Sequence, residues 1–209
     1  IPDSLITSFS IPIIDTNDVD TFLADNNLYD YPFLKLKISG SDSLPLMNKL
    51  SEVFQGKIRI DANEGFKSAE EVSKFIDNFK DLSKIEFIEQ PLPSSMNKEM
   101  IYLKGKFDVD FIADESITEQ ENISELAEFF DGINIKLMKS GTIENAIGQL
   151  NEARQYNLKT MLGCMIETSL SISLAYKIGG DVDFIDLDGF LLIKEDPYKL
   201  LFENKGLIT

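Results

Sequence analysis

The chain has 209 residues, of which 43% are hydrophobic, 36 are acidic and 20 are basic, and it has no histidine. The net charge of −16 excludes a nucleic-acid-binding surface, because nothing would neutralise the phosphates. The absence of histidine excludes histidine-based triads, histidine general bases and histidine-ligated zinc, so any metal site would use oxygen ligands.

The size and hydrophobic content predict one domain over residues 1–209, near the lower size limit of a closed eight-stranded barrel. No apolar stretch approaches a membrane span and no signal peptide is visible, so we expect no membrane contact and a cytoplasmic location. Cys164 is the only cysteine, which excludes an intramolecular disulfide. Because the chain begins with Ile1 and Pro2, we expect that something upstream was removed or lies elsewhere.

Short apolar segments alternate with helical patterns along most of the chain. The predicted strands are residues 5–14, 33–38, 57–60, 85–88, 111–113, 133–135, 159–162 and 184–185. The predicted helices are residues 17–26, 44–54, 68–79, 96–104, 121–130, 142–156 and 170–178. Thr16 or Asn17 is expected to cap the first helix, and Ser68 with Glu71 forms a capping box for the third. Beyond residue 190 the pattern weakens, which leaves residues 191–209 as a C-terminal tail.

Charged residues end six of the apolar runs: Lys37, Asp61, Glu89, Asp114, Lys136 and the pair Asp186 and Asp188. The first five follow one another at intervals of 22 to 28 residues, about the length of one strand, one loop and one helix. Such parallel strands form either an open doubly wound sheet or a closed barrel. We favour an α/β fold of the TIM-type (β/α)7β barrel class, because an open sheet collects its polar residues at one switch point.

Three carboxylates, Asp61, Glu89 and Asp114, end three consecutive strands. Adjacent strands lie ~4.8 Å apart, so the three groups could share one cation. An all-oxygen ligand set favours Mg²⁺, with Mn²⁺ as the alternative. For each residue alone, a loop residue or a helix N-cap is the favoured interpretation, but their repetition in three consecutive units favours a metal site.

Two lysines, Lys37 and Lys136, flank this acidic set. A lysine acts as a base only when its pKa is lowered, which a nearby divalent cation and a second lysine both do. The alternative is that each lysine extends into solvent. Lys35 shares the strand face of Lys37, whereas Leu34 and Leu36 lie on the opposite face, so we expect the lysines to point into the barrel.

The last strand ends in Asp186 and Asp188, which share one face and would suit a substrate ammonium group. An Asx turn leading into Gly189 is equally consistent with the pair. Gly163 ends the seventh strand and lets the following backbone approach a ligand, although an ordinary turn is the alternative. Cys164 is not expected to be a nucleophile, because it has no histidine partner.

Seven segments together resemble the muconate-lactonising subgroup of the enolase superfamily and, within it, the dipeptide epimerases, of which L-Ala-D/L-Glu epimerases are the best known. The segments are KLK (35–37), DANEG (61–65), IEQPLP (88–93), ADES (113–116), IKLMKSG (135–141), GCMIET (163–168) and DLD (186–188). The resemblance spans residues 5–190 and concerns the barrel domain of that family. The second lysine and the Asp-Leu-Asp pair point to the dipeptide epimerases.

The resemblance implies that Asp61, Glu89 and Asp114 bind Mg²⁺. It implies that Lys37 and Lys136 are acid/base lysines on opposite faces of the substrate carbon. Further residues have implied roles in substrate binding: Lys35 at the substrate carboxylate or enolate, Asp186 and Asp188 at the α-ammonium group, and Cys164, Met165, Ile166 and Ser10 as contacts. Two more are implied to support the metal ligands: Asn63 and Glu115.

The implied activity is that of an isomerase: a Mg²⁺-dependent dipeptide epimerase that inverts the α-carbon of the second residue by two-lysine 1,1-proton transfer through an enolate. The alternatives are a cycloisomerase, an o-succinylbenzoate synthase or an N-succinylamino acid racemase of the same subgroup, a Schiff-base lysine barrel, or a catalytically silent barrel scaffold. The expected partners are a dipeptide and an N-terminal α+β capping domain, which is not expected within these residues. Association into a homo-oligomer and the identity of the dipeptide stay open.

Overall fold

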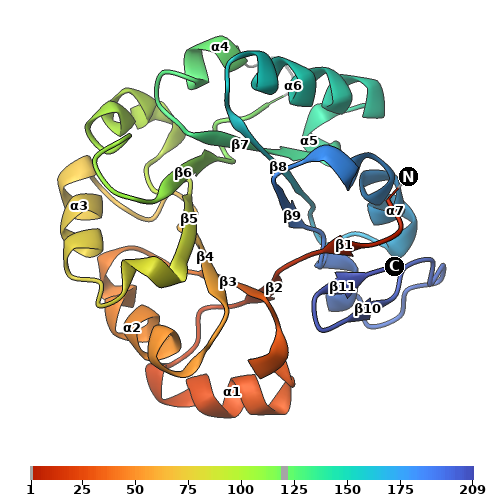
Figure 1. Ribbon diagram of the computed structural model, residues 1–209, viewed down its shortest axis with the longest axis horizontal. Helices are drawn as coiled ribbons and strands as arrows, with labels where there is room; N and C mark the ends of the chain where they lie inside the picture. The colour runs from red at the N-terminus through yellow and green to blue at the C-terminus, as the bar shows by residue number, and fades with distance from the viewer. Residues whose placement is uncertain (1, 119–121) are drawn as a thin grey trace.

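Eight parallel strands form a nearly closed barrel in the computed structural model, which describes residues 2–118 and 122–209 (Figure 1). Each strand pairs in parallel with the next one along the chain. The strands are β2 (Phe9–Ile11), β3 (Phe33–Lys37), β4 (Lys57–Asp61), β5 (Ile85–Glu89), β6 (Asp110–Ala113), β7 (Gly132–Lys136), β8 (Lys159–Gly163) and β9 (Phe184–Asp186). The predicted TIM-type barrel is therefore confirmed.

Helices cover the outside of the barrel (Figure 1). They are α1 (Val19–Asp25), α2 (Leu44–Val53), α3 (Ala69–Asp77), α4 (Ile123–Leu126), α5 (Leu137–Ser140), α6 (Ile143–Gln155) and α7 (Ser169–Ile178). The crossover from β5 to β6 is a 3-10 helix, Ser94–Tyr102, where residues 96–104 were predicted to be helical. Glu121, the first residue of the predicted helix 121–130, lies outside the described residues.

One predicted helix cap is wrong and one is correct in part. Neither Thr16 nor Asn17 caps the first helical segment, because Asp15 accepts a hydrogen bond from the Asn17 N–H at 2.8 Å. Ser68 caps α3 as predicted, accepting from the Glu71 N–H at 3.2 Å, but the Glu71 carboxylate accepts from the Lys67 N–H at 2.8 Å instead of completing the box at Ser68.

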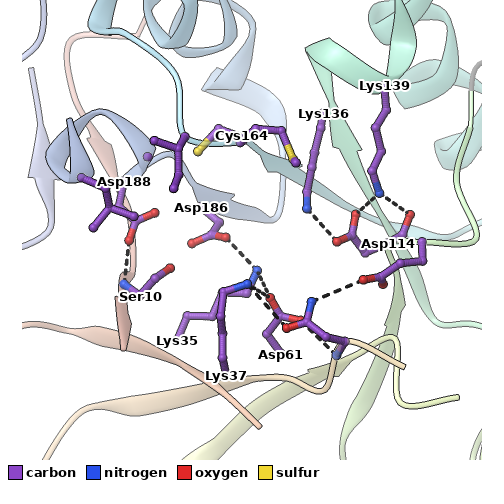
Figure 2. Close-up of a pocket in the computed structure, with 16 residues that line it drawn as sticks. Ser10, Lys35, Lys37, Asp61, Asp114, Lys136, Lys139, Cys164, Asp186 and Asp188 are labelled. Carbon is purple, nitrogen blue, oxygen red and sulfur yellow. Dashed lines mark hydrogen bonds and ion pairs between the residues drawn. The ribbon is translucent and has the colours of Figure 1, made fainter. Parts of the chain in front are cut away.

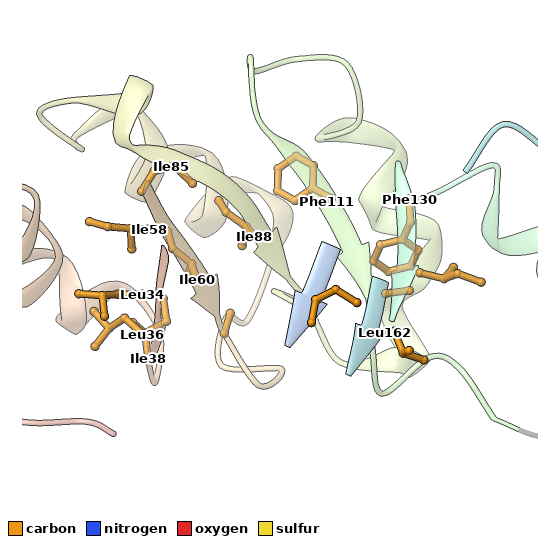
Figure 3. Packing of buried hydrophobic residues seen from close by; sticks show 14 of the residues in the cluster. Leu34, Leu36, Ile38, Ile58, Ile60, Ile85, Ile88, Phe111, Phe130 and Leu162 are labelled. Atoms are coloured by element: carbon orange, nitrogen blue, oxygen red, sulfur yellow. The ribbon is translucent and has the colours of Figure 1, made fainter. Parts of the chain in front are cut away.

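The strands present two different apolar faces. The outward residues pack against the helices and form the large core shown in Figure 3, which includes Leu34, Leu36 and Ile60. A separate small cluster of buried side chains fills part of the interior: Phe87, Ile112, Met161 and Phe184. The alternation of side chains along each strand separates these two cores, as the positions of Lys35 and Lys37 predicted.

The tail does not remain an irregular segment. Its end forms β10 (Glu203–Asn204) and β11 (Leu207–Ile208), and β11 pairs with β1 (Leu5–Ile6) at the start of the chain. The predicted first strand, residues 5–14, is therefore two short strands in two different sheets. None of the helices in the described residues is long and apolar enough to cross a membrane.

Side-chain contacts close the barrel between β9 and the start of β2. The Leu187 N–H donates to the Thr7 hydroxyl at 2.8 Å. The Ser10 N–H donates to Asp188 Oδ2 at 2.6 Å. These contacts join positions at opposite ends of the chain, and they bring Asp188 beside the first strand of the barrel.

Candidate active site

A cavity of about 460 Å³ opens at the carboxyl ends of the strands (Figure 2). Every residue that the sequence predicted for the site lines this cavity except Glu89, which is fully buried. The register of the strands explains the convergence, because Lys37 pairs with Asp61 and Asp61 pairs with Glu89. The sequence expectation that these strand ends form one site is thus consistent with the geometry.

Lys35 connects the metal-ligand candidates to Asp186 at the end of β9. Its Nζ lies 2.7 Å from Glu89 Oε2, 2.8 Å from Asp186 Oδ2 and 3.3 Å from Asp61 Oδ2. Burial lowers the pKa of Lys35, but these carboxylates outweigh burial and raise it well above its ordinary value. Lys35 therefore contacts three acidic side chains at once and favours their charged forms.

The third acidic residue, Asp114, is held by two other lysines. Lys136 Nζ lies 2.6 Å from its Oδ2, and Lys139 Nζ lies 2.6 Å from its Oδ1. Burial raises the pKa of Asp114, but the two ammonium groups lower it overall to about 2. Lys139 was missed in the sequence, although its position three residues after Lys136 in the same motif was a usable signal.

The three candidate metal ligands have the oxygen atoms that a divalent cation prefers. Their side chains are not arranged around a common metal position in this structure. As the side chains lie, no group of three cysteine, aspartate or glutamate residues within the described part of the chain is arranged to hold a metal ion. Burial raises the pKa of Glu89 to about 8, partly offset by Lys35. Among the described residues, Glu89 Oε2 also has no hydrogen bond of regular geometry. A buried carboxylate in an all-oxygen set suits Mg²⁺ or Mn²⁺, which would compete with Lys35 for Glu89 Oε2.

The two candidate acid/base lysines face each other across the cavity. Lys37 lies on β3 and Lys136 on β7, which are opposite strands of the barrel order. Figure 2 shows their amino groups entering the cavity from different sides. The Lys37 side chain is 46% exposed, whereas that of Lys136 is 9% exposed. Burial lowers the pKa of Lys136, but Asp114 and then Glu89 raise it overall.

The acidic pair on β9 divides into two different groups. Both oxygens of Asp186 have partners, since Ser8 donates to Oδ1 at 2.6 Å and Lys35 to Oδ2 at 2.8 Å. Burial, followed by the charge of Asp186, raises the pKa of Asp188 to about 7. Asp188 Oδ2 accepts the Ser10 N–H at 2.6 Å, and Asp188 lines the cavity, where a ligand can reach it.

The loop after β8 offers fewer unpaired backbone N–H groups to a ligand than the sequence indicated. Cys164, Met165 and Ile166 all line the cavity, but the Met165 N–H already donates to Glu167 Oε1 at 2.9 Å. Burial raises the pKa of the Cys164 thiol, which agrees with its exclusion as a nucleophile.

Asn63 and Glu115 lie beside the metal-ligand candidates. The Asn63 amide donates to Glu115 Oε1 at 3.3 Å, and Lys37 Nζ lies 3.5 Å from Asn63 Oδ1. Burial raises the pKa of Glu115, and the neighbouring Asp114 raises it further. These contacts link the lysine on β3 to the loop after β6.

Two buried amides that support the site were not found in the sequence. The Asn134 amide donates to Glu89 Oε1 at 2.8 Å. Its signal was its position two residues before Lys136, on the same strand face. The Gln90 side chain accepts from the N–H groups of Asp114 and Ser116 at 3.0 and 3.2 Å. Nothing in the local pattern distinguishes Gln90, because its partners belong to the next strand.

Comparisons with known proteins agree with this geometry. Residues 22–197 match a family model described as Enolase C-terminal domain-like. The chain is 40% identical over 208 residues to an L-Ala-D/L-amino acid epimerase of Pedosphaera parvula, covering 98% of this chain and 59% of that protein. It is 33% identical over 203 residues to an L-Ala-D/L-Glu epimerase of Bacteroides thetaiotaomicron, covering 97% and 52%. The chain therefore spans only about half to three fifths of the length of these relatives.

Solved structures share the same barrel. An enolase family member from Agrobacterium tumefaciens with homology to dipeptide epimerases has a TM-score of 0.87 at 31% identity, covering 98% of this chain and 61% of that one. The L-Ala-D/L-Glu epimerase of Bacillus subtilis has a TM-score of 0.90 at 24% identity, covering 99% and 61%, which shows likeness of fold alone.

Proposed function

Because the chain belongs to the enolase superfamily, in the family described as Enolase C-terminal domain-like, we propose that the protein is a divalent-metal-dependent dipeptide epimerase. It inverts the α-carbon of the second residue by 1,1-proton transfer between two lysines. The observation that carries this proposal is the placement of Lys37 and Lys136 on opposite walls of one cavity, with Asp186 and Asp188 on a third wall.

Asp61, Glu89 and Asp114 would hold the cation, with Mg²⁺ preferred and Mn²⁺ as the alternative. When bound, the cation supplies electrostatic stabilisation for the negative charge that develops on the substrate carboxylate. Lys35, buried next to Asp61 and Glu89, stabilises the same charge from the floor of the site. Asn63 and Glu115 support the loops that carry the ligands.

Proton transfer uses the two lysines in opposite protonation states. One neutral lysine removes the α-proton, and the other, protonated, delivers a proton to the opposite face of the carbon. Two groups are needed because a single side chain cannot reach both faces. Because Asp114 and Glu89 raise its pKa, Lys136 is the lysine that acts as the acid in one direction of the proposed reaction.

The β9 pair selects a substrate with a free amino terminus. Asp188 lines the cavity and is the direct partner we propose for the α-ammonium group, with Asp186 beside it. Ser10 and the loop residues Cys164, Met165 and Ile166 complete this wall of the cavity. N-succinylated amino acids and muconates lack the ammonium group, so the acidic pair disfavours those substrates.

We also propose an α+β capping domain as a partner of this barrel. Exposed apolar side chains follow the carboxyl ends of β2, β7, β8 and β9 around the mouth of the cavity: Ile13, Met138, Met165, Ile166 and Leu192. Covering them would exclude water and strengthen the electrostatic interactions inside the site.

A cytoplasmic location is proposed because the fold uses no disulfide within the described residues.

The test is proton-to-deuterium exchange followed by NMR, using the natural full-length protein, Mg²⁺ and a mixed dipeptide library in D₂O. Exchange at the α-carbon of the second residue, abolished by EDTA, is the expected result. Exchange that appears instead with succinylated amino acids would favour the racemase alternative, and no exchange with any dipeptide would overturn the proposal.

Single lysine variants test the two-base mechanism. Lys37→Met is expected to abolish epimerisation and to leave slow exchange with solvent for only one of the two epimers, and Lys136→Met is expected to leave it only for the other. Separate exchange time courses for each epimer measure this. Equal residual exchange from both epimers in either variant contradicts the two-base model.

A further inference from the structure

Two buried polar residues in the barrel interior have no role in the proposed mechanism. Ser8 lies in the short segment between β1 and β2 and is fully buried, and Arg59 lies on β4 with 2% of its surface exposed. Neither one lines the cavity. Both are connected to Asp186, which does line it, so they are part of the support beneath the ammonium end of the site.

The direction of the Ser8 hydrogen bond follows from its neighbours. Arg59 Nη1 lies 3.3 Å from Ser8 Oγ, and a guanidinium group can only donate. A hydroxyl has a single proton, so Ser8 accepts from Arg59 and donates to Asp186 Oδ1 at 2.6 Å. Lys35 donates to the other oxygen of Asp186 at 2.8 Å. Both oxygens of this carboxylate are thus fixed by donors that favour its charged form.

Arg59 is itself held in one place. Its Nε donates to Glu86 Oε2 at 2.6 Å, and its guanidinium carbon lies 4.4 Å from the centre of the Phe33 ring and 5.4 Å from that of Phe87. A second donor of Arg59 binds the backbone carbonyl of Ile185, next to Asp186. A buried arginine with these partners is a rigid anchor.

The Ser8 backbone is equally constrained from the C-terminal hairpin. The preceding residue, Thr7, donates its N–H to the Gly206 carbonyl at 2.8 Å, in the turn between β10 and β11. Its hydroxyl accepts the Leu187 N–H, one residue after Asp186. Ser8 is therefore fixed relative to the end of β9 by contacts on both sides.

We propose that Ser8 and Arg59 are positioning residues that hold Asp186 in place beside Asp188, and that they thereby determine the preference for a substrate with a free amino terminus. Neither residue touches the substrate. The inference rests on the proposed function, and it adds that selection of the ammonium group depends on the floor of the barrel as well as on its mouth.

The test compares two ligands that differ only in the amino group. The natural full-length protein with Mg²⁺ is assayed with L-Ala-L-Glu as the substrate, and propionyl-L-Glu, its des-amino analogue, is measured as a competitive inhibitor. Ser8→Ala removes a hydrogen bond to a charged group, so kcat/KM for the dipeptide should fall about tenfold, mainly through KM. The inhibition constant of propionyl-L-Glu should stay unchanged, because that ligand lacks the ammonium group.

A double-mutant cycle separates positioning from a general loss of stability. In an Asp186→Asn background, Ser8→Ala should have no further effect, since its partner charge is already gone. Arg59→Lys keeps the charge but not the forked donors. It should therefore lower kcat/KM for the dipeptide relative to the affinity for propionyl-L-Glu, as Ser8→Ala does. Ser51→Ala, which removes a buried serine hydroxyl bonded to the Asn48 carbonyl on an outer helix, should leave the ratio unchanged.

Several outcomes overturn the inference. Equal weakening of both ligands in Ser8→Ala, or additive effects in the double variant, would show that Ser8 acts only on the general fold. If Ser8→Ala does not fold, Ser8→Cys replaces it. Its thiol is a weaker donor, so it should also weaken the dipeptide and leave the inhibition constant of propionyl-L-Glu unchanged. If the wild-type protein is active and the variants do not change the preference for L-Ala-L-Glu over propionyl-L-Glu, this inference alone is overturned. A wild-type protein that exchanges no dipeptide overturns the proposed function together with it.

Discussion

Gly163 illustrates how a single position on β8 supports the site without any chemistry of its own. A Cβ added there would lie within 3.0 Å of three side-chain atoms of Asn134. The Asn134 amide in turn donates to Glu89 Oε1. The glycine is needed for space inside the barrel, in addition to the approach of backbone to ligand that the sequence indicated.

Gly163→Ala is expected to displace Asn134 and with it Glu89. The overpacked interior should lower the free energy of unfolding by ~1–3 kcal/mol, and Mg²⁺ affinity should fall by about tenfold, the lower end for loss of a residue behind a ligand. Urea unfolding and calorimetric Mg²⁺ titration measure the two effects. Gly148→Ala on α6, where a Cβ meets nothing within 4 Å, is the control and should be neutral or stabilising.

Asp188 gives the site a pH dependence. Its pKa is raised to about 7, so the carboxylate becomes charged as the pH rises through neutrality, and only the charged form attracts an ammonium group. KM for a dipeptide should therefore fall between pH 5.5 and 7.5, a range in which the substrate amino group remains largely protonated. Steady-state kinetics across this range, with Asp188→Asn as the comparison, check the expectation. A pH dependence that survives in Asp188→Asn assigns the effect to another group.

At the scale of elements, the metal-ligand strands are joined by side-chain to backbone bonds. Gln90 follows β5 directly, and its carbonyl oxygen accepts two N–H groups from the loop after β6. Its amide donates to the Leu92 carbonyl at 2.9 Å. Gln90 also has a positive φ of 34°, which for a residue other than glycine costs roughly 1–3 kcal/mol. The loop conformation persists because these hydrogen bonds compensate.

Gln90→Met should leave the N–H groups of Asp114 and Ser116 buried without an acceptor. Each unsatisfied group costs ~1–3 kcal/mol, so the free energy of unfolding should fall by more than in an ordinary surface variant. Hydrogen exchange at the two amides should become faster, which locates the effect in the β6 loop. Gln55→Met, at an exposed position, is the matched control and should change stability by less than ~0.5 kcal/mol.

At the scale of the whole molecule, cation binding at the site should change the free energy of unfolding. Burial raises the pKa of Glu89 in the folded protein to about 8, whereas its ordinary value, expected for the unfolded chain, is 4.5. The unfolded state therefore binds fewer protons between these values, and the contribution of Glu89 to stability falls as the pH rises through that window. A cation on the ionised carboxylate would reverse this loss.

Saturating Mg²⁺ is thus expected to raise Tm, and more at pH 8 than at pH 6. At one hundred times Kd, binding stabilises the folded state by ~2.7 kcal/mol, which corresponds to about 5–10 °C for a chain of this length. Thermal scans with and without EDTA at both pH values, with Glu89→Gln as the variant that should not respond, measure the effect. An equal shift at both pH values would show that Glu89 does not titrate with binding.

The order of elements and most of the lining residues could be read from the sequence. Alternation along a strand places Lys35 and Lys37 on one face, and parallel strands bring their carboxyl ends to the same rim, so Asp61 and Asp114 were found without tertiary information. Helix ends were less predictable, because the cap at Asp15 depends on local hydrogen bonds that several neighbouring residues could make equally well.

Only the tertiary structure decided how these residues are paired. Contacts between the two ends of the chain join Ser8 and Lys35 to Asp186, across 178 and 151 residues, and no local pattern specifies such a pair. The same holds for the hairpin that pairs β11 with β1. Local sequence determines the direction of a side chain on its strand, but closure of the barrel determines which side chains it meets, because that depends on register and packing summed over all strands.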